Sequence, residues 1–166
     1  MRLFVGLDVS SFDMKVCFLN GDGEKLDSFS VSNDLPGATT LKEKLLQCIA
    51  GKEVDILKIG LESTSVYSFH PSMFLHHDID LQRFGAKVFL LNPKQVANFK
   101  KSYSDMNKTD EIDAFVIADY LRFGRNQMSI VKGKSVRGTA AINKITIPTC
   151  QNVNERKTTL SSTPKF

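Results

Sequence analysis

Three runs with strand character, separated by short turns, occupy the first 31 residues of the chain and strongly constrain its fold. Leu3 to Val9 is an apolar run, Met14 to Leu19 alternates apolar with other residues, and Lys25 to Val31 follows after a turn. That turn, Asn20-Gly21-Asp22-Gly23, is typical of a hairpin because Asn and Gly accept a positive φ. The sequence therefore predicts an antiparallel meander of three strands.

Helical and strand patterns alternate after the meander. The remaining predicted elements are, in order, a helix over 41–50 capped by Gly51, a strand over 55–61, a helix over 65–78 interrupted by Pro71, a strand over 86–91, a short helix over 93–101 and a helix that starts near 110. The order β-β-β-α-β-α-β-α is that of the ribonuclease H-like fold. We therefore predict the α/β class, with a mixed five-stranded sheet and helices on both faces.

The net charge of +4 is carried by the C-terminal end of the chain. Residues 1–131 have a balance of −2, whereas residues 132–166 hold seven basic residues and a single acid, Glu155. This end is rich in Thr, Ser, Asn and Lys, a composition that buries little apolar surface. We predict a domain at 1–128 and a basic, weakly ordered tail at 129–166, which either touches nucleic acid non-specifically or is simply solvated.

Several classes of protein are excluded by composition. The sequence has no apolar run of about 18 residues, so we expect no membrane partner. Its N-terminus has the pattern of a strand rather than of a signal peptide. Cys17, Cys48 and Cys150 have neither zinc nor disulfide spacing, which indicates a reducing, cytoplasmic setting.

Two carboxylates stand three residues apart in Lys108-Thr109-Asp110-Glu111-Ile112-Asp113-Ala114, where the last predicted helix begins. Residues i and i+3 share a helix face, so Asp110 and Asp113 would point the same way. A cation such as Mg²⁺ or Mn²⁺ would relieve their repulsion. The alternative is an acidic first turn that the helix dipole favours. Lys108 and Thr109, beside the acids, are candidates to contact a phosphate.

Two further carboxylates, Asp8 and Glu62, fall at the carboxyl ends of predicted strands, where sites gather in open α/β sheets. Four acids there would hold two divalent ions about 3.5–4 Å apart, as in phosphodiester chemistry. One ion would activate the attacking oxygen and the other would stabilise the leaving oxygen. Each acid has a structural alternative: Asp8 would cap a turn with Ser10 and Ser11, and Glu62 would cap the next helix.

Other polar residues have a structural interpretation. Asp119 lies within an apolar helical pattern and is interpreted as a salt-bridge partner of Arg122. His70, His76 and His77 are expected on a surface or at a helix end rather than on a metal.

Four motifs resemble the successive motifs of DEDD-type insertion-sequence transposases, the IS110 family, which is related to the Piv DNA invertases. They are Val5-Gly6-Leu7-Asp8-Val9, Gly60-Leu61-Glu62-Ser63-Thr64, Leu91-Asn92-Pro93-Lys94-Gln95-Val96 and the stretch from Lys108 to Ala114. The resemblance covers roughly residues 3–125 and implies a RuvC-like N-terminal domain. It implies that Asp8, Glu62, Asp110 and Asp113 are the Mg²⁺-binding tetrad. We take Lys94, in the third motif, as a further nucleic-acid contact.

The resemblance also implies DNA recombination as the activity, namely excision and insertion of a mobile element. It implies DNA as a partner, self-association into multimers and, as in some relatives, an element-encoded guide RNA. Full-length relatives continue into a second domain with a nucleophilic serine. The similarity fades after about Arg125, so we expect a truncated form, and Ser63 is not assigned that role. The alternatives are a free-standing junction nuclease and a non-catalytic DNA- or RNA-binding remnant.

Overall fold

An antiparallel meander opens the fold, as the sequence predicts. The computed structural model describes residues 1–63, 66–103, 110–124 and 129–130. In it, β1 (Arg2–Val9), β2 (Asp13–Asn20) and β3 (Lys25–Ser32) pair antiparallel in sequence order. The hairpin between β2 and β3 is confirmed: Gly23 has a φ of 90°, and the Asn20 side chain accepts hydrogen bonds from the backbone of Asp22 and Glu24.

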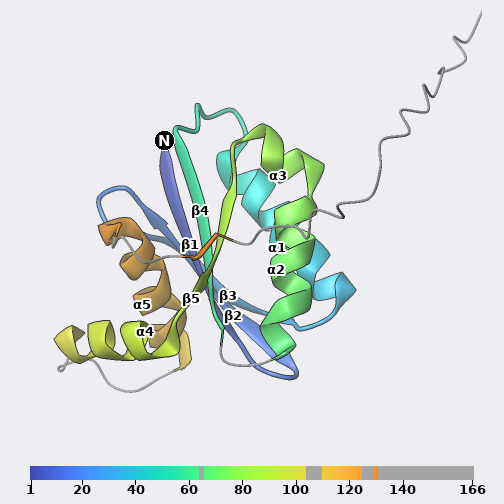
Figure 1. The fold of residues 1–166 in the computed structure, drawn as a ribbon. Coiled ribbons are helices and arrows are strands. Elements are labelled where there is room, and N and C mark those ends of the chain that lie inside the picture. Colours follow the sequence, from blue (N-terminus) through green and yellow to red (C-terminus); the bar gives the residue numbers. More distant parts are fainter. Residues whose placement is uncertain (64–65, 104–109, 125–128, 131–166) are drawn as a thin grey trace, which may run out of the picture. The chain divides into compact units, whose positions relative to one another are not determined.

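Parallel strands complete the sheet. β4 (Ile56–Glu62) lies parallel to β1, and β5 (Lys87–Leu91) lies parallel to β4. A two-residue strand, β6 (Ser129–Ile130), pairs antiparallel with β5 at the edge, so that the order is β3-β2-β1-β4-β5-β6 (Figure 1). The five predicted strands and the mixed pairing are confirmed, and β6 is an addition. The boundary between a domain at 1–128 and a tail at 129–166 stays a prediction, because most of the tail lies outside the described residues.

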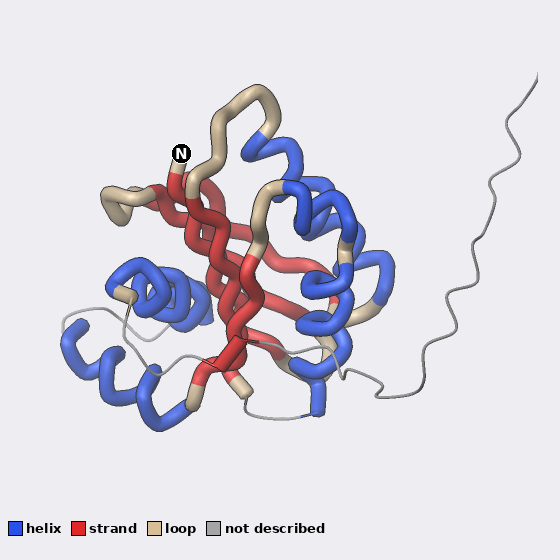
Figure 2. The backbone as a smooth tube through the Cα atoms, turned by 45° about the horizontal axis from the view of Figure 1, so that its top comes forward, coloured by secondary structure: helices blue, strands red, loops and turns tan. Residues whose placement is uncertain are grey.

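Helices lie on both faces of the sheet, also as predicted (Figure 2). One face carries α1 (Leu35–Ile49), α2 (Phe69–His77) and α3 (Ile79–Arg83), with the short helix η1 (Val66–Ser68) before α2. The other carries α4 (Pro93–Lys100), η2 (Lys101–Tyr103) and α5 (Asp110–Phe123). Among the described helices, none is long and apolar enough to cross a membrane.

The segment at 65–78 differs in detail from its prediction. Pro71 does not interrupt a helix, because it lies in the first turn of α2, where backbone N–H groups have no intrahelical partner. The break comes instead at Asp78, whose carboxylate accepts hydrogen bonds from the backbone of Asp80 and Leu81 and caps α3. A capping carboxylate therefore starts a second, short helix that apolar periodicity did not reveal.

The sheet separates two apolar cores. Side chains of alternate residues on β1, including Leu3, Val5 and Leu7, pack with α1 and α2. The opposite face carries Phe4 of β1 and packs with α4 and α5. Because side chains alternate along a strand, every residue of β1 and β4 can be assigned to one of these faces.

Candidate active site

Asp8 and Glu62 lie on the same face of the sheet, at the carboxyl ends of neighbouring parallel strands. Leu7 of β1 pairs with Leu61 of β4, and both leucines are fully buried in the core that packs with α1 and α2. Each acid is the next residue along its strand, so each points to the opposite face, which α5 covers. The two carboxylates are half-buried there.

Glycines allow α5 to lie directly on this face. A Cβ atom at Gly6 would stand 2.1 Å from the Ala114 carbonyl oxygen and 2.5 Å from the Ala118 nitrogen. A Cβ atom at Gly60 would stand 2.7 Å from a methyl carbon of Leu121. Side chains at these positions would push the helix away. Ala114 follows Asp113, so the contact that seats the helix also brings Asp113 to the carboxyl ends of β1 and β4.

The three carboxylates share one electrostatic environment. Burial, and after it the negative charges of Asp8 and Asp113, raise the pKa of Glu62 to about 7 against the opposing effect of the Lys100 ammonium. Lys100, at the end of α4, forms an ion pair with Asp113. A carboxyl group with a raised pKa among like charges, at the edge of a sheet, is typical of a functional site.

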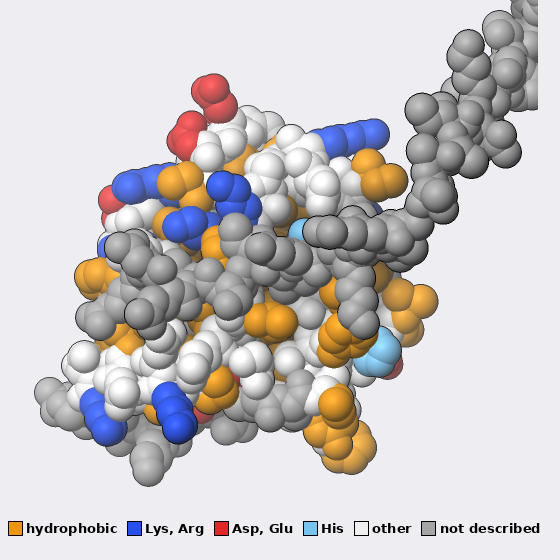
Figure 3. Space-filling view, in the orientation of Figure 1, with side chains coloured by type: hydrophobic (Ala, Val, Ile, Leu, Met, Phe, Trp, Pro, Cys, Tyr) orange, Lys and Arg blue, Asp and Glu red, His pale blue; other side chains and the backbone are white. Residues whose placement is uncertain are grey.

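The other predicted site residues are described only in part. Asp110 is the first residue of α5, and only its backbone belongs to the described part of the chain. Lys108 and Thr109 lie outside the described residues. Lys94 is exposed in the first turn of α4, where its backbone N–H donates to the Asn92 side chain. The basic side chains of α4 are lysines, and blue side chains stand out at the lower left of Figure 3, where α4 lies.

Ser63, directly after Glu62, has a structural role. Its backbone N–H and its hydroxyl both donate to the carbonyl oxygen of Leu91, at 3.0 and 3.1 Å. These bonds join the ends of β4 and β5. They fix the backbone beside Glu62, which favours an accurately placed carboxylate.

Asp119 is the salt-bridge partner of Arg122, as the sequence predicts. The Asp119 side chain is 5% exposed, and its carboxylate accepts a hydrogen bond from the Arg122 guanidinium at 2.6 Å. It also accepts one from the Tyr103 hydroxyl, a contact that the sequence did not reveal. Burial and this hydrogen bond raise the pKa of Tyr103 to about 12. The hydrogen bond between Tyr103 and Asp119 attaches η2 to α5 and so fixes the end of α4 that carries Lys100.

Sequence reasoning missed Lys100. A usable signal exists, because Lys100 lies four residues after Val96, and residues at i and i+4 share a helix face. Val96 is buried in the core beneath α5. The lysine therefore follows an inward-facing row of α4, unlike an ordinary surface lysine.

The acids fit a divalent cation by chemistry, although their side chains are not gathered around one point. Within the described part of the chain, no three His, Cys, Asp or Glu side chains are arranged to hold a metal ion. Asp113 is instead paired with Lys100. Carboxylate oxygens are the ligands that Mg²⁺ and Mn²⁺ prefer. The donor types of Asp8, Glu62 and Asp113 therefore fit such an ion, and Asp110 would add a fourth.

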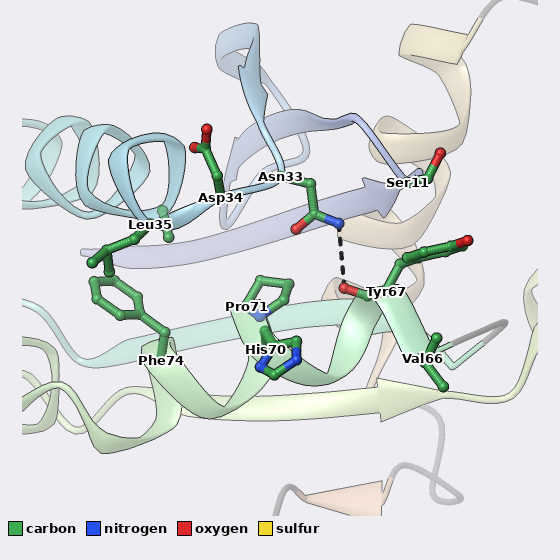
Figure 4. Close-up of a pocket in the computed structure, with 10 residues that line it drawn as sticks. Ser11, Asn33, Asp34, Leu35, Val66, Tyr67, His70, Pro71 and Phe74 are labelled. Atoms are coloured by element: carbon green, nitrogen blue, oxygen red, sulfur yellow. Dashed lines mark hydrogen bonds between the residues drawn. The ribbon is translucent and has the colours of Figure 1, made fainter.

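A separate cavity of about 630 Å³ lies on the other face, between the start of α1 and α2. Figure 4 shows Asn33, whose side-chain nitrogen donates to the Tyr67 carbonyl oxygen at 3.4 Å across it. The residues described around it include none of the three carboxylates. Among the described residues that line it, the acid is Asp34, which accepts a hydrogen bond from the Gly37 backbone and caps α1. This cavity is therefore not the acidic site.

The sheet order, with acids at the carboxyl ends of its central strands, defines a ribonuclease H-like domain. Similar solved structures include RuvC of T. thermophilus in complex with a Holliday junction substrate, at 11% identity and a TM-score of 0.51. The match covers 79% of this chain and 100% of that one. A Thermus thermophilus RuvC structure matches at 12% identity and a TM-score of 0.49, over 78% of this chain and 100% of the other. The first likeness confirms the predicted RuvC-like fold.

The sequence profile of the IS110-type DEDD transposase family matches residues 5–157, and the chain belongs to this transposase family. No protein with a curated description matches it. The match confirms the resemblance seen in the four motifs, and it extends to residue 157, beyond Arg125, where the similarity was expected to fade. It makes this chain a catalytic domain of the DNA transposase type, and membership implies dependence on a divalent metal ion.

Proposed function

We propose that Asp8, Glu62, Asp110 and Asp113 bind Mg²⁺, or Mn²⁺, as a pair of ions and so carry out phosphodiester chemistry on DNA during transposition. The observation that carries the proposal is the meeting of three acids on one face. Burial first, and then the charges of Asp8 and Asp113, raise the pKa of Glu62, so the three acids interact across two strands and a helix. Acids that repel one another in this way are typical of a metal site.

Each part of the site would have a distinct task. The bound ions supply Lewis-acid activation of the attacking oxygen and stabilisation of the leaving oxygen. Asp8 and Glu62, on adjacent strands, fix two ligand positions relative to each other, and Asp113 adds a third from α5. With a pKa of about 7, Glu62 holds a proton part of the time near neutral pH and releases it when a cation arrives.

The proposed contacts to DNA come from neighbouring segments. Lys94 is exposed at the start of α4, which follows β5 directly. Lys108 and Thr109 precede Asp110 in sequence. We propose that these three side chains bind phosphates of DNA, since lysine ammonium groups and hydroxyl groups are common phosphate donors. A guide RNA, a homo-oligomer and a cytoplasmic location are further proposals, carried by the family resemblance and the cysteine pattern alone.

Calorimetry with Mn²⁺ and Mg²⁺ tests the metal site. We expect the wild-type chain to bind and Asp113→Asn to bind at least about tenfold more weakly, because one charged ligand is lost. Glu43→Gln, an exposed carboxylate on α1, is the matched control and should bind like wild type. Equal binding by wild type and Asp113→Asn would contradict the assignment of the acids.

Cleavage of labelled DNA tests the reaction. Linear duplexes and four-way junctions are both tested as substrates, because a protein of similar fold has been solved in complex with a Holliday junction. We expect metal-dependent cutting or strand joining that Glu62→Gln abolishes and Glu43→Gln leaves intact. Metal binding without any reaction on these DNAs would indicate that the domain binds the ion but does not act alone.

A further inference from the structure

Lys100 is the cation that the structure places among the proposed metal ligands. Its ammonium pairs with Asp113, and the two side chains are 34% and 36% exposed. The same charge acts on Glu62. We propose that Lys100 is the resident counter-cation of the acidic site: it holds Asp113 in the metal-free protein, yields it to a divalent ion, and then binds a phosphate of the DNA. This inference rests on the proposed function.

The backbone at Lys100 is held on both sides, so only its side chain can move. The preceding residue, Phe99, is buried and makes edge-to-face contacts with the rings of Tyr103, Tyr120 and Phe123. Three residues after Lys100, the Tyr103 hydroxyl donates to the buried carboxylate of Asp119. A lysine has a flexible four-carbon stem. Its ammonium can therefore leave Asp113 without any movement of α4 or α5.

The pairing also involves one of the proposed metal ligands directly. No three acidic or other ligating side chains of the described residues are arranged to hold an ion. Asp113 makes its ion pair with Lys100 instead. Without a cation, three carboxylates in this position would repel one another. Lys100 thus reduces the repulsion in the metal-free protein, at the expense of competing with the metal ion for Asp113.

Release of Lys100 would place an ammonium beside the reacting phosphate. A divalent ion and an ammonium repel at short distance, so the bound ion favours departure of Lys100 from Asp113. The nearest new anion would be a phosphate of the DNA that the metal ions bind. Lysine is a common point-charge partner of phosphate. Lys100 would therefore contact DNA only when the metal is present.

The first test measures metal binding by the full chain without DNA. Lys100→Met is compared with Lys101→Met, which removes the next, exposed lysine, and with Lys100→Arg, which keeps the charge. Circular dichroism confirms that each variant folds, and calorimetry with MnCl₂ is done at pH 8.5, where Glu62 is ionised. We expect Lys100→Met to bind Mn²⁺ about three- to tenfold more tightly than wild type, with both other variants within about twofold.

The second test measures DNA affinity by fluorescence anisotropy, with Mn²⁺ and with EDTA. We expect Lys100→Met to lose about threefold or more in affinity with Mn²⁺ and nothing in EDTA, whereas Lys101→Met should behave alike in both. An unchanged or weaker Mn²⁺ affinity of Lys100→Met would overturn the inference. So would a loss of DNA affinity that is the same with Mn²⁺ and with EDTA. If wild type binds Mn²⁺ and Lys100→Met binds it equally, only the role of Lys100 fails. If neither binds Mn²⁺, the proposed metal site fails as well.

Discussion

The two faces of the sheet are covered in different ways. Toward α1 and α2 the contacts are made by branched side chains such as Leu7, Leu45 and Ile59, all fully buried. Toward α5, where the helix crosses β1 and β4, glycine faces the helix backbone at Gly6 and a leucine at Gly60. Interlocking side chains can repack by small shifts, but a helix backbone lying on a glycine cannot approach further or accept an added atom. The acids lie on the second face, so we infer that backbone contact sets the position of Asp113.

Altering one packing contact on each face should change the free energy of unfolding more than any other substitution considered below. Gly6→Ala adds a Cβ atom 2.1 Å from the Ala114 oxygen and should destabilise the fold by about 3 kcal/mol, because α5 must move. Leu45→Ala leaves a cavity under α1 and should cost about 3 kcal/mol as well. Urea unfolding measures both. Although the losses of stability match, only Gly6→Ala should weaken Mn²⁺ binding, by about tenfold or more.

The Leu45→Ala variant is the control for general destabilisation, because its cavity lies on the face without the acids. If both variants lose metal affinity alike, the site depends on overall stability rather than on the contact between α5 and Gly6. If Gly6→Ala keeps wild-type affinity, α5 does not position Asp113 in the way described.

The two faces of the sheet also differ in their ion pairs. Asp119, beneath η2, is buried with Arg122 and Tyr103, so Asp119→Asn should cost about 2–3 kcal/mol by leaving a partly buried guanidinium without its charge partner. On the other face, Arg83 pairs with Asp80 at 3.5 Å with side chains that are 74% and 45% exposed, so Arg83→Met should cost much less. Thermal unfolding compares them. Equal losses would mean that the buried pair contributes no more than the surface one.

Local patterns revealed much of this arrangement, and contacts distant in sequence account for what was missed. Period-2 alternation and the Asn20–Gly23 turn fixed the meander, and strand ends placed Asp8 and Glu62 correctly on one edge. Gly6 within a strand signals a close approach, but the sequence does not say that Ala114 is the neighbour.

The same limit explains the missed residues. Lys100 meets Asp113 across 13 residues, and Tyr103 meets Asp119 across 16. The spacing from Val96 indicates that Lys100 follows an inward-facing row, but no local pattern says which residue of α5 either side chain meets. Likewise β6 pairs with β5, although a strand of two residues is too short for alternation to predict. The assignment of the four acids to a metal stays a prediction that only binding can test.

The pH dependence of stability should also differ between acids on the two faces. Glu62 has a folded-state pKa of about 7 against an ordinary 4.5, so the folded protein binds this proton more tightly than the unfolded chain. Stability in EDTA should therefore fall as pH rises from about 4.5 to about 7, by about 1–2 kcal/mol for a half-buried group. Urea unfolding of wild type and Glu62→Gln between pH 5 and 8 isolates this slope.

Asp34, which caps α1 on the other face, is the control of opposite sign. Hydrogen bonds from the Ser32 hydroxyl and then the Gly37 backbone lower its pKa below the ordinary 3.8. Its stabilisation is therefore complete above that value and constant from pH 5 to 8, so Asp34→Asn should leave the slope unchanged. A wild-type curve as flat as that of Glu62→Gln would show that Glu62 does not titrate in this range.

The last comparison between the two faces concerns the reactivity of two thiols. Cys17 of β2 is fully buried in the core beneath α5, and burial raises its pKa to about 11. Cys48 of α1 is only half-buried. In a Cys150→Ser background, a disulfide reagent should label Cys48 at least about tenfold faster than Cys17, because the thiolate is the reactive form and must be accessible. Gly6→Ala should accelerate Cys17 selectively, since it loosens α5, whereas Leu45→Ala should accelerate Cys48. Equal acceleration of both thiols by either variant would mean that the helices on the two faces of the sheet open together. The packing of α5 on the sheet would then not be an independent unit of the fold.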